Sequence, residues 1–542
     1  MARTPLASSL RSLWRDLGTA RRTGIPVDEL RDLRAEERTR RGPSRRRFLA
    51  GAAAAAGVAA LPGRARAASG EPTVAIIGGG IGGLTCALTL LDKGIESTVF
   101  EASNRIGGRM FSNRTGYWAA NQISEWGGEL IDTGHLTVQA LAARFDIPID
   151  DLFAAQPASA VDIYRVLGSY YSKTQADADF NAIWNTVRDE QRSAPFPSTY
   201  DSYTAAGAAL DQLSIYDWIE SRVPGGHSSP LGQVLDVAYN IEFGAETTDQ
   251  SSLNLLYLLA FQPKPFDHTL GIFGESDERY HIRGGNQRVP EAIAAYLGDR
   301  VVMGHKLSQI RETSGGRYRL TLERGSQTVE QTYDYVVLAL PFAAYTFDYA
   351  QAGFDALKHQ AITELGRGHN GKLQVQFDQR GWRGNGPWPG VSSGSSFADT
   401  GYQASWEVTR AQAGTPGILC LYSGGAVTDA MRTTTAFATA TDSRVRADVQ
   451  IGVGQLAPVY PGLAWNGKAT QSLWHKAPLF NASYSYYRTG QYTAFGGHEI
   501  EPQGGVYFCG EHTSLDYQGF MEGGAYTGTV TAKALRQAIR GS

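Results

Sequence analysis

Glycines with the spacing G-x-G-x-x-G occur in the run Gly78-Gly79-Gly80-Ile81-Gly82-Gly83. Such a run can bind a pyrophosphate, because its backbone N–H groups can approach phosphate oxygens closely. Gly78 would make the turn, Gly80 would face the pyrophosphate, and Gly83 would let a helix pack on a strand. The flanking residues fit this interpretation, since a β-branched apolar strand is expected at 73–77 and a helix with apolar spacing of i, i+3, i+4 and i+7 from residue 84.

A second short strand is expected at 97–100, and it leads into Glu101, 18 residues after Gly83. A carboxylate at that place accepts hydrogen bonds from an adenosine ribose and disfavours a 2′-phosphate. These features indicate a dinucleotide but do not choose between NAD and FAD. Arg105 and Arg109 flank a further glycine pair, 107–108, which adds donors and positive charge where phosphates would lie.

The other end of the chain carries a second glycine-rich pattern. Residues 505–512 (GVYFCGEH) predict a strand that enters a tight turn, and residues 519–525 (GFMEGGA) predict the start of a helix running toward Arg536. N–H groups at the start of such a helix can stabilise negative charge. The rest of the chain has no second G-x-G-x-x-G between a strand and a helix, which disfavours a two-nucleotide reductase and favours oxygen as the electron acceptor.

These two patterns together resemble the flavin-containing amine oxidase family, over essentially the whole chain after residue 70. The resemblance implies an α/β fold with a Rossmann-like FAD-binding domain (GR2-type) interleaved with an α+β substrate-binding domain. It also implies oxidation of an amine by hydride transfer to flavin N5, with O₂ as acceptor. The imine would hydrolyse to an aldehyde or ketone plus ammonia or an amine, with release of H₂O₂. The residues that it assigns to FAD binding are Gly78, Gly80, Gly83, Glu101, Arg105, Gly108, Arg109, Gly127, Gly128, Glu129, Leu130, Leu307, Gly510, Glu511, Gly519 and Met521.

Four residues match family positions beside the reacting atoms. Lys372 corresponds to the lysine that reaches flavin N5 through a water, although a solvated lysine at a strand edge is the alternative. Trp474 and Tyr484 resemble the tryptophan near the flavin and one wall of an aromatic cage, with Tyr486 and Tyr487 competing for the second role. Phe520 stands where monoamine oxidases have the other tyrosine wall. Facing rings would give an apolar slot suited to a substrate nitrogen.

Two further positions depart from known members of the family. Ser483 replaces the cysteine that bonds to the flavin in mammalian-type monoamine oxidases, so we expect non-covalent FAD. L-amino acid oxidases place an arginine near Leu130 to bind the substrate carboxylate, whereas here Leu130 is apolar and Glu129 is acidic. This favours an amine without a carboxylate, with Glu129 either binding a second amino group or contacting the flavin, unless Arg283 or Arg488 reaches the substrate.

Three alternatives to an amine oxidase remain open on the sequence. The nearest is an L-amino acid oxidase with the same chemistry. A desaturase or isomerase that shares the FAD signatures is less favoured, because Lys372, Trp474 and Phe520 match amine oxidases. The third is a flavin-binding protein without turnover.

The expected elements divide the chain after residue 70 into interleaved segments. Residues 136–269 predict mostly helix, including 138–145 and 253–261, and residues 334–342 (DYVVLALPF) predict a buried strand and loop. Between residues 346 and 475 we expect strands at 372–377 and 418–422 and a helix at 436–451. The predicted FAD-binding domain is 70–135, 270–345 and 476–542, and the predicted substrate-binding domain is 136–269 and 346–475.

Composition excludes several function classes. Residues 68–542 contain 35 basic and 47 acidic residues, and this acidic balance disfavours nucleic acid as a partner. Three distant cysteines exclude a disulfide scaffold, and ten histidines without an H-x-x-x-H pair argue against a catalytic metal, so we expect no metal. No apolar run is long enough for a stable membrane span. A homodimer is compatible with the sequence, which does not fix the oligomeric state.

The first 67 residues predict an export signal. They carry 15 Arg, no Lys and six acidic residues, and Ser44-Arg45-Arg46-Arg47-Phe48-Leu49 precedes a short run of small residues that ends in an A-x-A pattern at 65–67. A basic region, a weakly apolar stretch and small residues are the parts of a secretory signal. The arginine pair resembles a twin-arginine signal, which implies the twin-arginine export machinery as a partner and a periplasmic or secreted location.

Overall fold

The strand expected before the glycine run is β1 (Val74–Ile77), and it is the centre of a five-stranded parallel sheet. Its four residues are all buried, as expected for a central parallel strand covered on both faces. The computed structural model describes residues 16, 18–23, 25–31, 72–262 and 269–541. The strand order is β23-β13-β1-β2-β9, with β23 at Val506–Phe508, β13 at Tyr335–Leu338, β2 at Thr98–Glu101 and β9 at Val301–Met303.

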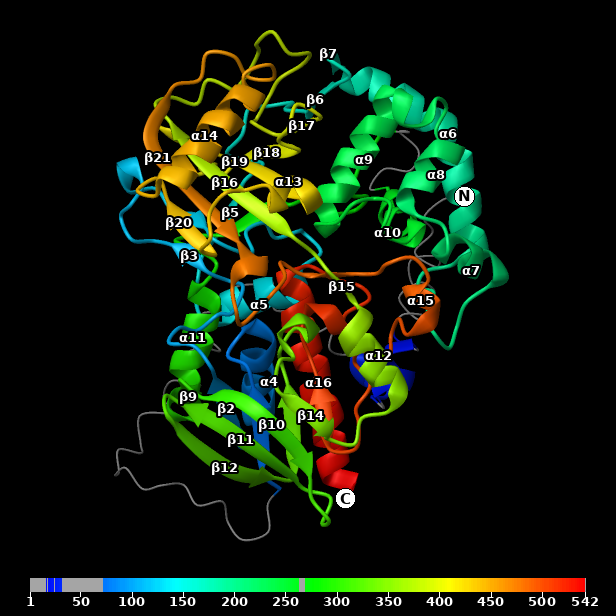
Figure 1. Ribbon diagram of the computed structural model, residues 1–542, viewed down its shortest axis with the longest axis vertical. Helices are drawn as coiled ribbons and strands as arrows, with labels where there is room; N and C mark the ends of the chain where they lie inside the picture. Colours follow the sequence, from blue (N-terminus) through cyan, green and yellow to red (C-terminus); the bar gives the residue numbers. More distant parts are fainter. Residues whose placement is uncertain (1–15, 17, 24, 32–71, 263–268, 542) are drawn as a thin grey trace.

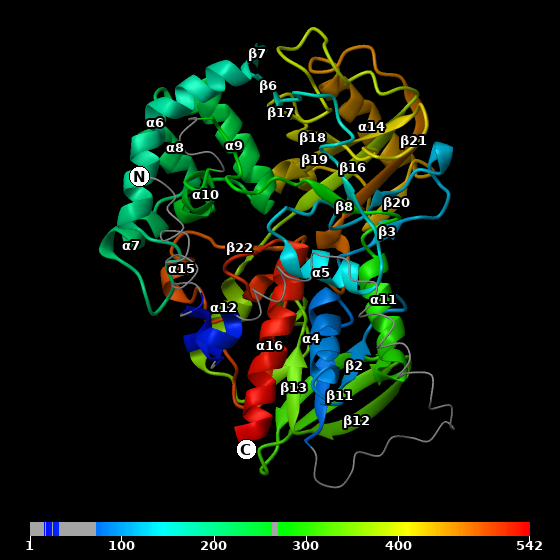
Figure 2. The same cartoon turned by 180° about the vertical axis from the view of Figure 1, so that it is seen from behind.

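Helices α4 (Ile81–Leu91) and α16 (Met521–Gly541) lie side by side on this sheet, as Figures 1 and 2 show. Small residues allow the close approach, because a Cβ added to Gly528 would lie 2.3 Å from the carbonyl oxygen of Gly82. The strand–helix turn is equally tight, since a Cβ on Gly83 would lie 2.1 Å from the carbonyl oxygen of Gly78. This agrees with the packing role predicted for Gly83. Flanking helices are α5 (Leu136–Arg144) and α11 (Arg288–Leu297).

A four-stranded sheet lies at the far end of the same half of the molecule (Figure 1). Its order is β12-β11-β10-β14, and β10 carries Leu307, which is buried. The strands are β10 at Lys306–Glu312, β11 at Tyr318–Arg324, β12 at Gln327–Tyr333 and β14 at Asp348–Gln351.

The other half is built on an eight-stranded sheet, in the order β20-β21-β16-β19-β18-β17-β6-β7. Strand β16 is buried along its whole length and pairs antiparallel with β19 and β21. The members are β20 (Phe437–Thr439), β21 (Trp465–Leu473), β16 (Asn370–Phe377), β19 (Gly417–Gly424), β18 (Ala404–Glu407), β17 (Ser396–Ala398), β6 (Ile163–Val166) and β7 (Ser169–Tyr171).

Five helices stand beside this sheet (Figure 1), and the residue before each is Ser or Thr. In each case the hydroxyl accepts a hydrogen bond from an N–H of the first turn, which satisfies a donor that the helix itself cannot pair. The helices are α6 (Lys173–Ser193), α7 (Ala205–Asp211), α8 (Ile215–Arg222), α9 (Pro230–Phe243) and α10 (Ser252–Leu259). Helix α14 (Ser443–Leu456) packs on β21 and β16 of the same sheet. The remaining elements are α12 (Ala356–Glu364), α13 (Gly425–Asp429), α15 (Gln491–Ala494), β15 (Gly366–Arg367) and β22 (Ser485–Tyr486).

The predicted fold class is confirmed, and most predicted elements exist near their predicted bounds. The helix predicted at 436–451 is wrong at its start. Residues Phe437–Thr439 form β20, which pairs with β21, and the helix begins only at Ser443 because the Asp442 side chain accepts the N–H of Arg444 as an N-cap. The domain boundaries drawn from the sequence stay a prediction.

The twin-arginine motif and the A-x-A pattern lie outside the described residues. A part of the chain before them is described and packs on the body of the protein. Ile25 and Leu30 are buried, and the Glu29 carboxylate accepts a hydrogen bond from Gln537 on α16. Among the described helices, none is long and apolar enough to cross a bilayer.

The α4–α16 crossing yields a stability prediction. Gly528→Ala should lower the free energy of unfolding by about 1–3 kcal/mol, because the new methyl group would overlap the backbone of α4. Gly454→Ala on α14 is the matched control, since nothing lies within 4 Å of its added Cβ, and it should be neutral or stabilising by up to about 1 kcal/mol. Denaturant or thermal unfolding of both variants measures the difference, and equal effects would contradict the packing argument.

Candidate functional site

A cavity of about 320 Å³ lies between the five-stranded and the eight-stranded sheets. Its walls include residues at the carboxyl ends of parallel strands: Gly78 after β1, Glu101 at the end of β2 and Ala339 after β13. This is the edge at which open α/β sheets bind ligands. The opposite wall comes from β16, β18 and β19 of the eight-stranded sheet.

One end of the cavity is lined by the two glycine turns predicted from the sequence. Gly80 and Gly107 form a β-bridge, and a Cβ on Gly108 would lie 3.2 Å from the Cα of Gly80. Gly80 is also the N-cap of α4 and offers no side-chain acceptor, so the first N–H groups of this helix are free of a cap. A helix N-terminus with this form binds anions, and side chains on these glycines would fill the space.

Glu101 lies beside these turns. Its carboxylate accepts hydrogen bonds from the N–H groups of Gly79 (2.7 Å) and Ser103 (2.8 Å), which fixes its position at the cavity wall. A carboxylate can accept further bonds, so a ribose hydroxyl can still be bound. Leu307 lines the same end.

Arg109 and Glu511 connect the two glycine-rich patterns. The Arg109 guanidinium donates to the Glu511 carboxylate (2.9 Å) and to the carbonyl oxygen of Ser483 (2.8 Å). Burial is the largest single effect and raises the pKa of Glu511, but Arg109, His512 and the N–H of Gly519 together outweigh it, and the pKa is held below its usual value. Glu511 is therefore ionised and also accepts the N–H of Gly519 at the start of the last helical segment.

Fourteen of the sixteen residues predicted to bind FAD line this cavity, and Gly83 and Arg105 do not. Arg105 lies over the ring of Phe111 and donates to the carbonyl oxygen of Gly108, so it supports the second glycine turn. The fourteen are Gly78, Gly80, Glu101, Gly108, Arg109, Gly127, Gly128, Glu129, Leu130, Leu307, Gly510, Glu511, Gly519 and Met521. An uncapped helix N-terminus, two glycine turns and a carboxylate at a strand end fit a dinucleotide such as FAD.

Lys372 is not a solvated edge residue. Its side chain is 10% exposed, and its ammonium donates to the Glu129 carboxylate and to the carbonyl oxygen of Gly127, both at 2.7 Å. Burial is the largest single effect and opposes both charges, but the attraction between the two groups together with their hydrogen bonds outweighs it, so the pKa of Lys372 is raised and the pKa of Glu129 is lowered. Both groups are charged at neutral pH. Glu129 also accepts the indole N–H of Trp406, so two donors already hold it.

The three predicted aromatic residues, Trp474, Tyr484 and Phe520, all line the cavity, whereas Tyr486 and Tyr487 do not. The Trp474 indole donates to the carbonyl oxygen of Trp126 at 2.8 Å. The Tyr484 ring lies beside Gly519, the neighbour of Phe520, and its hydroxyl donates to the carbonyl oxygen of Ile241. Their roles toward a substrate stay predictions.

The residues of the cavity wall that sequence reasoning missed include Trp406, Tyr422, Glu242 and Glu278. Strand register explains the first two, because Lys372 pairs with Tyr422 and Tyr422 pairs with Ala404, two residues from Trp406. Alternate residues on a strand share a face, so these side chains reach the cavity together. The predicted strand at 418–422 could have suggested Tyr422, but only the pairing order shows which face is the wall.

Glu242, at the end of α9, and Glu278 make this end of the cavity acidic. Burial and then their mutual repulsion raise the pKa of Glu242 to about 8, and burial with Asp132 does the same for Glu278. The arginines considered from the sequence bind elsewhere, Arg283 to Asp150 and Arg488 to Asp249. Neither of them lines the cavity.

Ser483 also lines the cavity, but its hydroxyl is already engaged. It donates to the carbonyl oxygen of Gly368 at 2.8 Å, and the Asn370 side chain lies 2.6 Å away. The serine thus holds the start of β16 against the segment that leads to β22.

Comparisons with known proteins agree with this geometry. The profile of the family described as flavin containing amine oxidoreductase matches residues 81–536. The flavin-containing amine oxidase of Danio rerio is 23% identical over 487 residues, which cover 86% of each chain. YobN of Bacillus subtilis (strain 168), provisionally named an L-amino-acid oxidase, is 22% identical over 495 residues, covering 83% of this chain and 92% of YobN.

Solved structures show the same fold. Cyclohexylamine oxidase from Brevibacterium oxydans IH-35A superposes with a TM-score of 0.70 at 20% identity, covering 87% of this chain and all (100%) of that one. Putrescine oxidase bound to putrescine superposes with a TM-score of 0.67 at 17% identity, covering 85% of this chain and 98% of that one.

The buried ion pair predicts non-additive effects on stability. Lys372→Met should lower the free energy of unfolding by about 3–5 kcal/mol, because it leaves the Glu129 carboxylate buried without its cation. Adding Glu129→Gln to this variant should recover most of the loss, since the amide carries no charge. Lys468→Met is the matched control, because that lysine bonds only a carbonyl oxygen, and it should cost less than about 1 kcal/mol. Additive losses in the double variant, measured by chemical unfolding, would contradict a coupled pair.

Proposed function

Because the chain belongs to the family of flavin containing amine oxidoreductases, we propose that it oxidises amines that lack an α-carboxylate, with molecular oxygen as the electron acceptor. The chain is thus an oxidoreductase that acts on amines, and FAD is its cofactor. The substrate class and the acceptor are the parts that we propose. Bound FAD would take up the hydride equivalent from the carbon that bears the amine.

The lack of a free cation among the described residues at the substrate end of the cavity carries the proposal. The lysines and arginines that line the cavity are Arg109, Lys306 and Lys372. Arg109 is bound to Glu511, Lys372 is bound to Glu129, and Lys306 lies beside Leu307 at the dinucleotide end. A substrate carboxylate would therefore meet Glu242 and Glu278 and find no free cation among the described residues of the wall, which costs several kcal/mol in a buried site.

The chain's own residues would orient the amine and exclude water. Tyr484 and Phe520 offer ring faces to the substrate nitrogen, and the apolar surroundings favour the neutral amine that oxidation requires. Lys372, fixed by Glu129, would position a water or oxygen near the reacting centre. The overall reaction converts the amine, O₂ and water to a carbonyl compound, ammonia or a smaller amine, and H₂O₂.

We propose non-covalent binding of FAD, which the engaged hydroxyl of Ser483 supports, since it offers no thiol for a thioether bond. We also propose export through the twin-arginine route to the periplasm or the medium. The support for export is the sequence around Arg45 and Arg46 and the pattern at 65–67. A homodimer stays a prediction.

An L-amino acid oxidase is the competing function, and a matched pair of substrates separates the two. We expect kcat/KM for 2-phenylethylamine to exceed that for L-phenylalanine by at least about a hundredfold, because the two differ only in the carboxylate that the cavity disfavours. A peroxide-coupled assay measures both, and bleaching of the flavin by each compound under nitrogen tests the reductive step alone. A preference for the amino acid would reverse the assignment, and bleaching by neither compound nor by a wider amine set would indicate a flavoprotein without amine turnover.

A further inference from the structure

Glu242 and Glu278 are acidic groups of the cavity whose carboxylates bind no described side chain directly. The buried Arg410, whose guanidinium donates to the carbonyl oxygen of Glu407, attracts Glu278 without bonding to it. Both line the cavity and are partly open to it, and neither carboxylate forms a hydrogen bond or ion pair with the described residues. Buried carboxylates are normally paired with a cation or bound to donors. The negative charges of Glu242 and Glu278 would instead repel each other, and the nearby carboxylate of Asp132, which accepts the N–H of Glu278, would repel both.

The pair lies next to the aromatic walls of the site. Ile241, the residue before Glu242, supplies the carbonyl oxygen that accepts the Tyr484 hydroxyl at 3.1 Å. The Tyr422 hydroxyl lies 3.0 Å from the Tyr484 hydroxyl and extends the same wall. The carboxylates thus lie at the hydroxyl end of Tyr484, while its ring lies beside Gly519 near the dinucleotide end.

We propose that Glu242 and Glu278 bind a second ammonium group of the substrate, so that the preferred amines are diamines or longer polyamines. The inference rests on the proposed function, and it names the class of amine. An ammonium group of the substrate would give the two carboxylates the cation that no described residue provides. It would also draw both groups into the carboxylate form, which burial disfavours when the cavity contains no cation. Glu129 cannot serve in this way, because Lys372 and Trp406 already occupy it.

Matched pairs of an n-alkylamine and the α,ω-diamine of the same chain length test the proposal. For the best chain length, kcat/KM should favour the diamine by at least about tenfold, and Glu242→Gln or Glu278→Gln should lower that ratio by at least about tenfold, mainly through KM. Glu330→Gln, at an exposed position on β12, is the matched control and should leave the ratio unchanged. Equal treatment of monoamines and diamines, or a ratio that the two glutamine variants do not change, would overturn the subsite.

The pH dependence gives a second readout. Both carboxyl groups have a pKa near 8 without ligand, so the KM of the diamine should fall as the pH rises through about 8, whereas the KM of the monoamine should follow only the groups common to both assays. Those common groups are Asp132, Arg410, Tyr422, Tyr484 and the Lys372–Glu129 pair. The difference should vanish in the glutamine variants. If no amine bleaches the flavin under nitrogen, the proposed function itself is wrong. If amines are oxidised without a preference for diamines, only the second-ammonium subsite is wrong.

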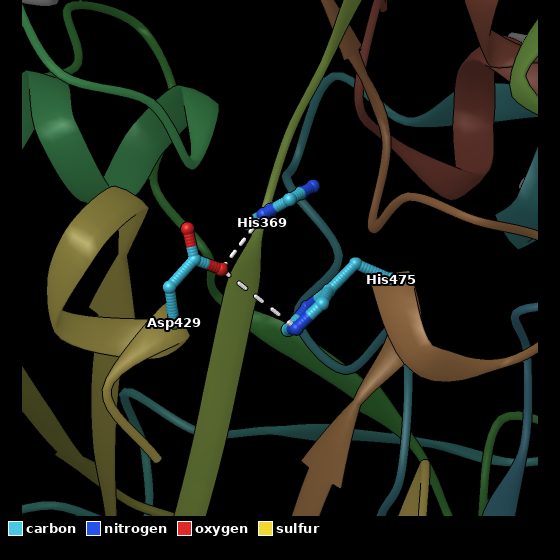
Figure 3. Close-up of side chains that lie close together, drawn as sticks. All are labelled: His369, Asp429 and His475. Atoms are coloured by element: carbon cyan, nitrogen blue, oxygen red, sulfur yellow. Dashed lines mark hydrogen bonds and ion pairs between the residues drawn. The ribbon is translucent and has the colours of Figure 1, made fainter. Parts of the chain in front are cut away.

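A separate cluster outside the cavity has the composition of a metal site. Figure 3 shows the imidazoles of His369 and His475 pointing toward the carboxylate of Asp429. Nδ1 of His369 lies 2.8 Å and Nε2 of His475 lies 3.8 Å from the same Asp429 oxygen. One donor atom of each side chain lies within 4.8 Å of those of the other two, and the two rings stack with centroids 4.4 Å apart.

From this convergence we infer a site for a divalent transition metal of the zinc class. Two imidazoles and a carboxylate are ligands that zinc prefers, and a water would complete the tetrahedron. The charge of Lys476 is directed away, because its ammonium donates to the carbonyl oxygens of Met431 and Thr433.

The ligands come from three segments: the residue before β16, the end of α13 and the 3₁₀ turn Trp474–Lys476. A bound ion would link segments that also carry Lys372 and Trp474, without contacting the cavity. Its expected effect is therefore on stability.

Isothermal titration of chelator-treated holoenzyme with ZnCl₂ tests this site. We expect one ion per chain with micromolar affinity, and a rise in the midpoint of thermal unfolding. His475→Gln and Asp429→Asn should each weaken binding by at least about tenfold, since each removes one of three ligands. His359→Gln, which removes a histidine on α12 outside the cluster, should not. Binding weaker than millimolar, or equal affinity in all variants, would overturn the site.

Discussion

The buried ion pair between Lys372 and Glu129 is the interaction on which the arrangement of the site depends. Lys372 belongs to β16, an interior strand of the eight-stranded sheet, whereas Glu129 follows the glycine pair 127–128 at the dinucleotide end. Neither charge could stay buried alone, so the two halves of the molecule must meet in the one arrangement that brings these groups together. The same ammonium also binds the carbonyl oxygen of Gly127, which fixes the glycine pair relative to β16.

The glycine pair then has little freedom. A Cβ on Gly127 would lie 1.9 Å from the carbonyl oxygen of Arg109 and 2.9 Å from the Trp474 ring, and one on Gly128 would lie 2.7 Å from the Met521 side chain. The segments that carry Arg109, Lys372, Trp474 and Met521 therefore all contact this glycine pair. The ion pair and this contact explain together why Trp474 and Met521 line one cavity although 46 residues separate them.

Local patterns predicted the dinucleotide end well, and the reason is physical. A strand, a glycine turn and a helix form one continuous unit, so Gly78, Gly80 and Glu101 occupy the cavity edge wherever the unit is folded. The substrate wall is different, because Trp406 and Tyr422 reach it only through the pairing of β16, β19 and β18, which no local pattern encodes. Sequence reasoning missed Glu242 for a related reason. A single carboxylate on a helix such as α9 would ordinarily be assigned to the solvent-exposed face, and only the structure shows that it faces a cavity. The sequence suggested that Glu129 could bind a second amino group of the substrate. We propose this role instead for Glu242 and Glu278, which sequence reasoning did not find.

The distribution of charge in the cavity follows from these positions. Glu129, Glu242 and Glu278 are three of the glutamates that line the cavity. Lys372 pairs only with Glu129, because its ammonium is already shared between that carboxylate and a backbone carbonyl oxygen. The Lys372–Glu129 pair beside the aromatic walls therefore has no net charge, whereas the carboxyl groups of Glu242 and Glu278 beyond Tyr484 form no ion pair with a described residue. At the substrate end, this change from a neutral ion pair to two carboxyl groups disfavours an anionic ligand group and favours a ligand whose positive charge lies away from its reacting carbon. Specificity in this site would thus depend on the unpaired carboxyl groups of Glu242 and Glu278 as much as on the contacts that the site makes with the reacting amine.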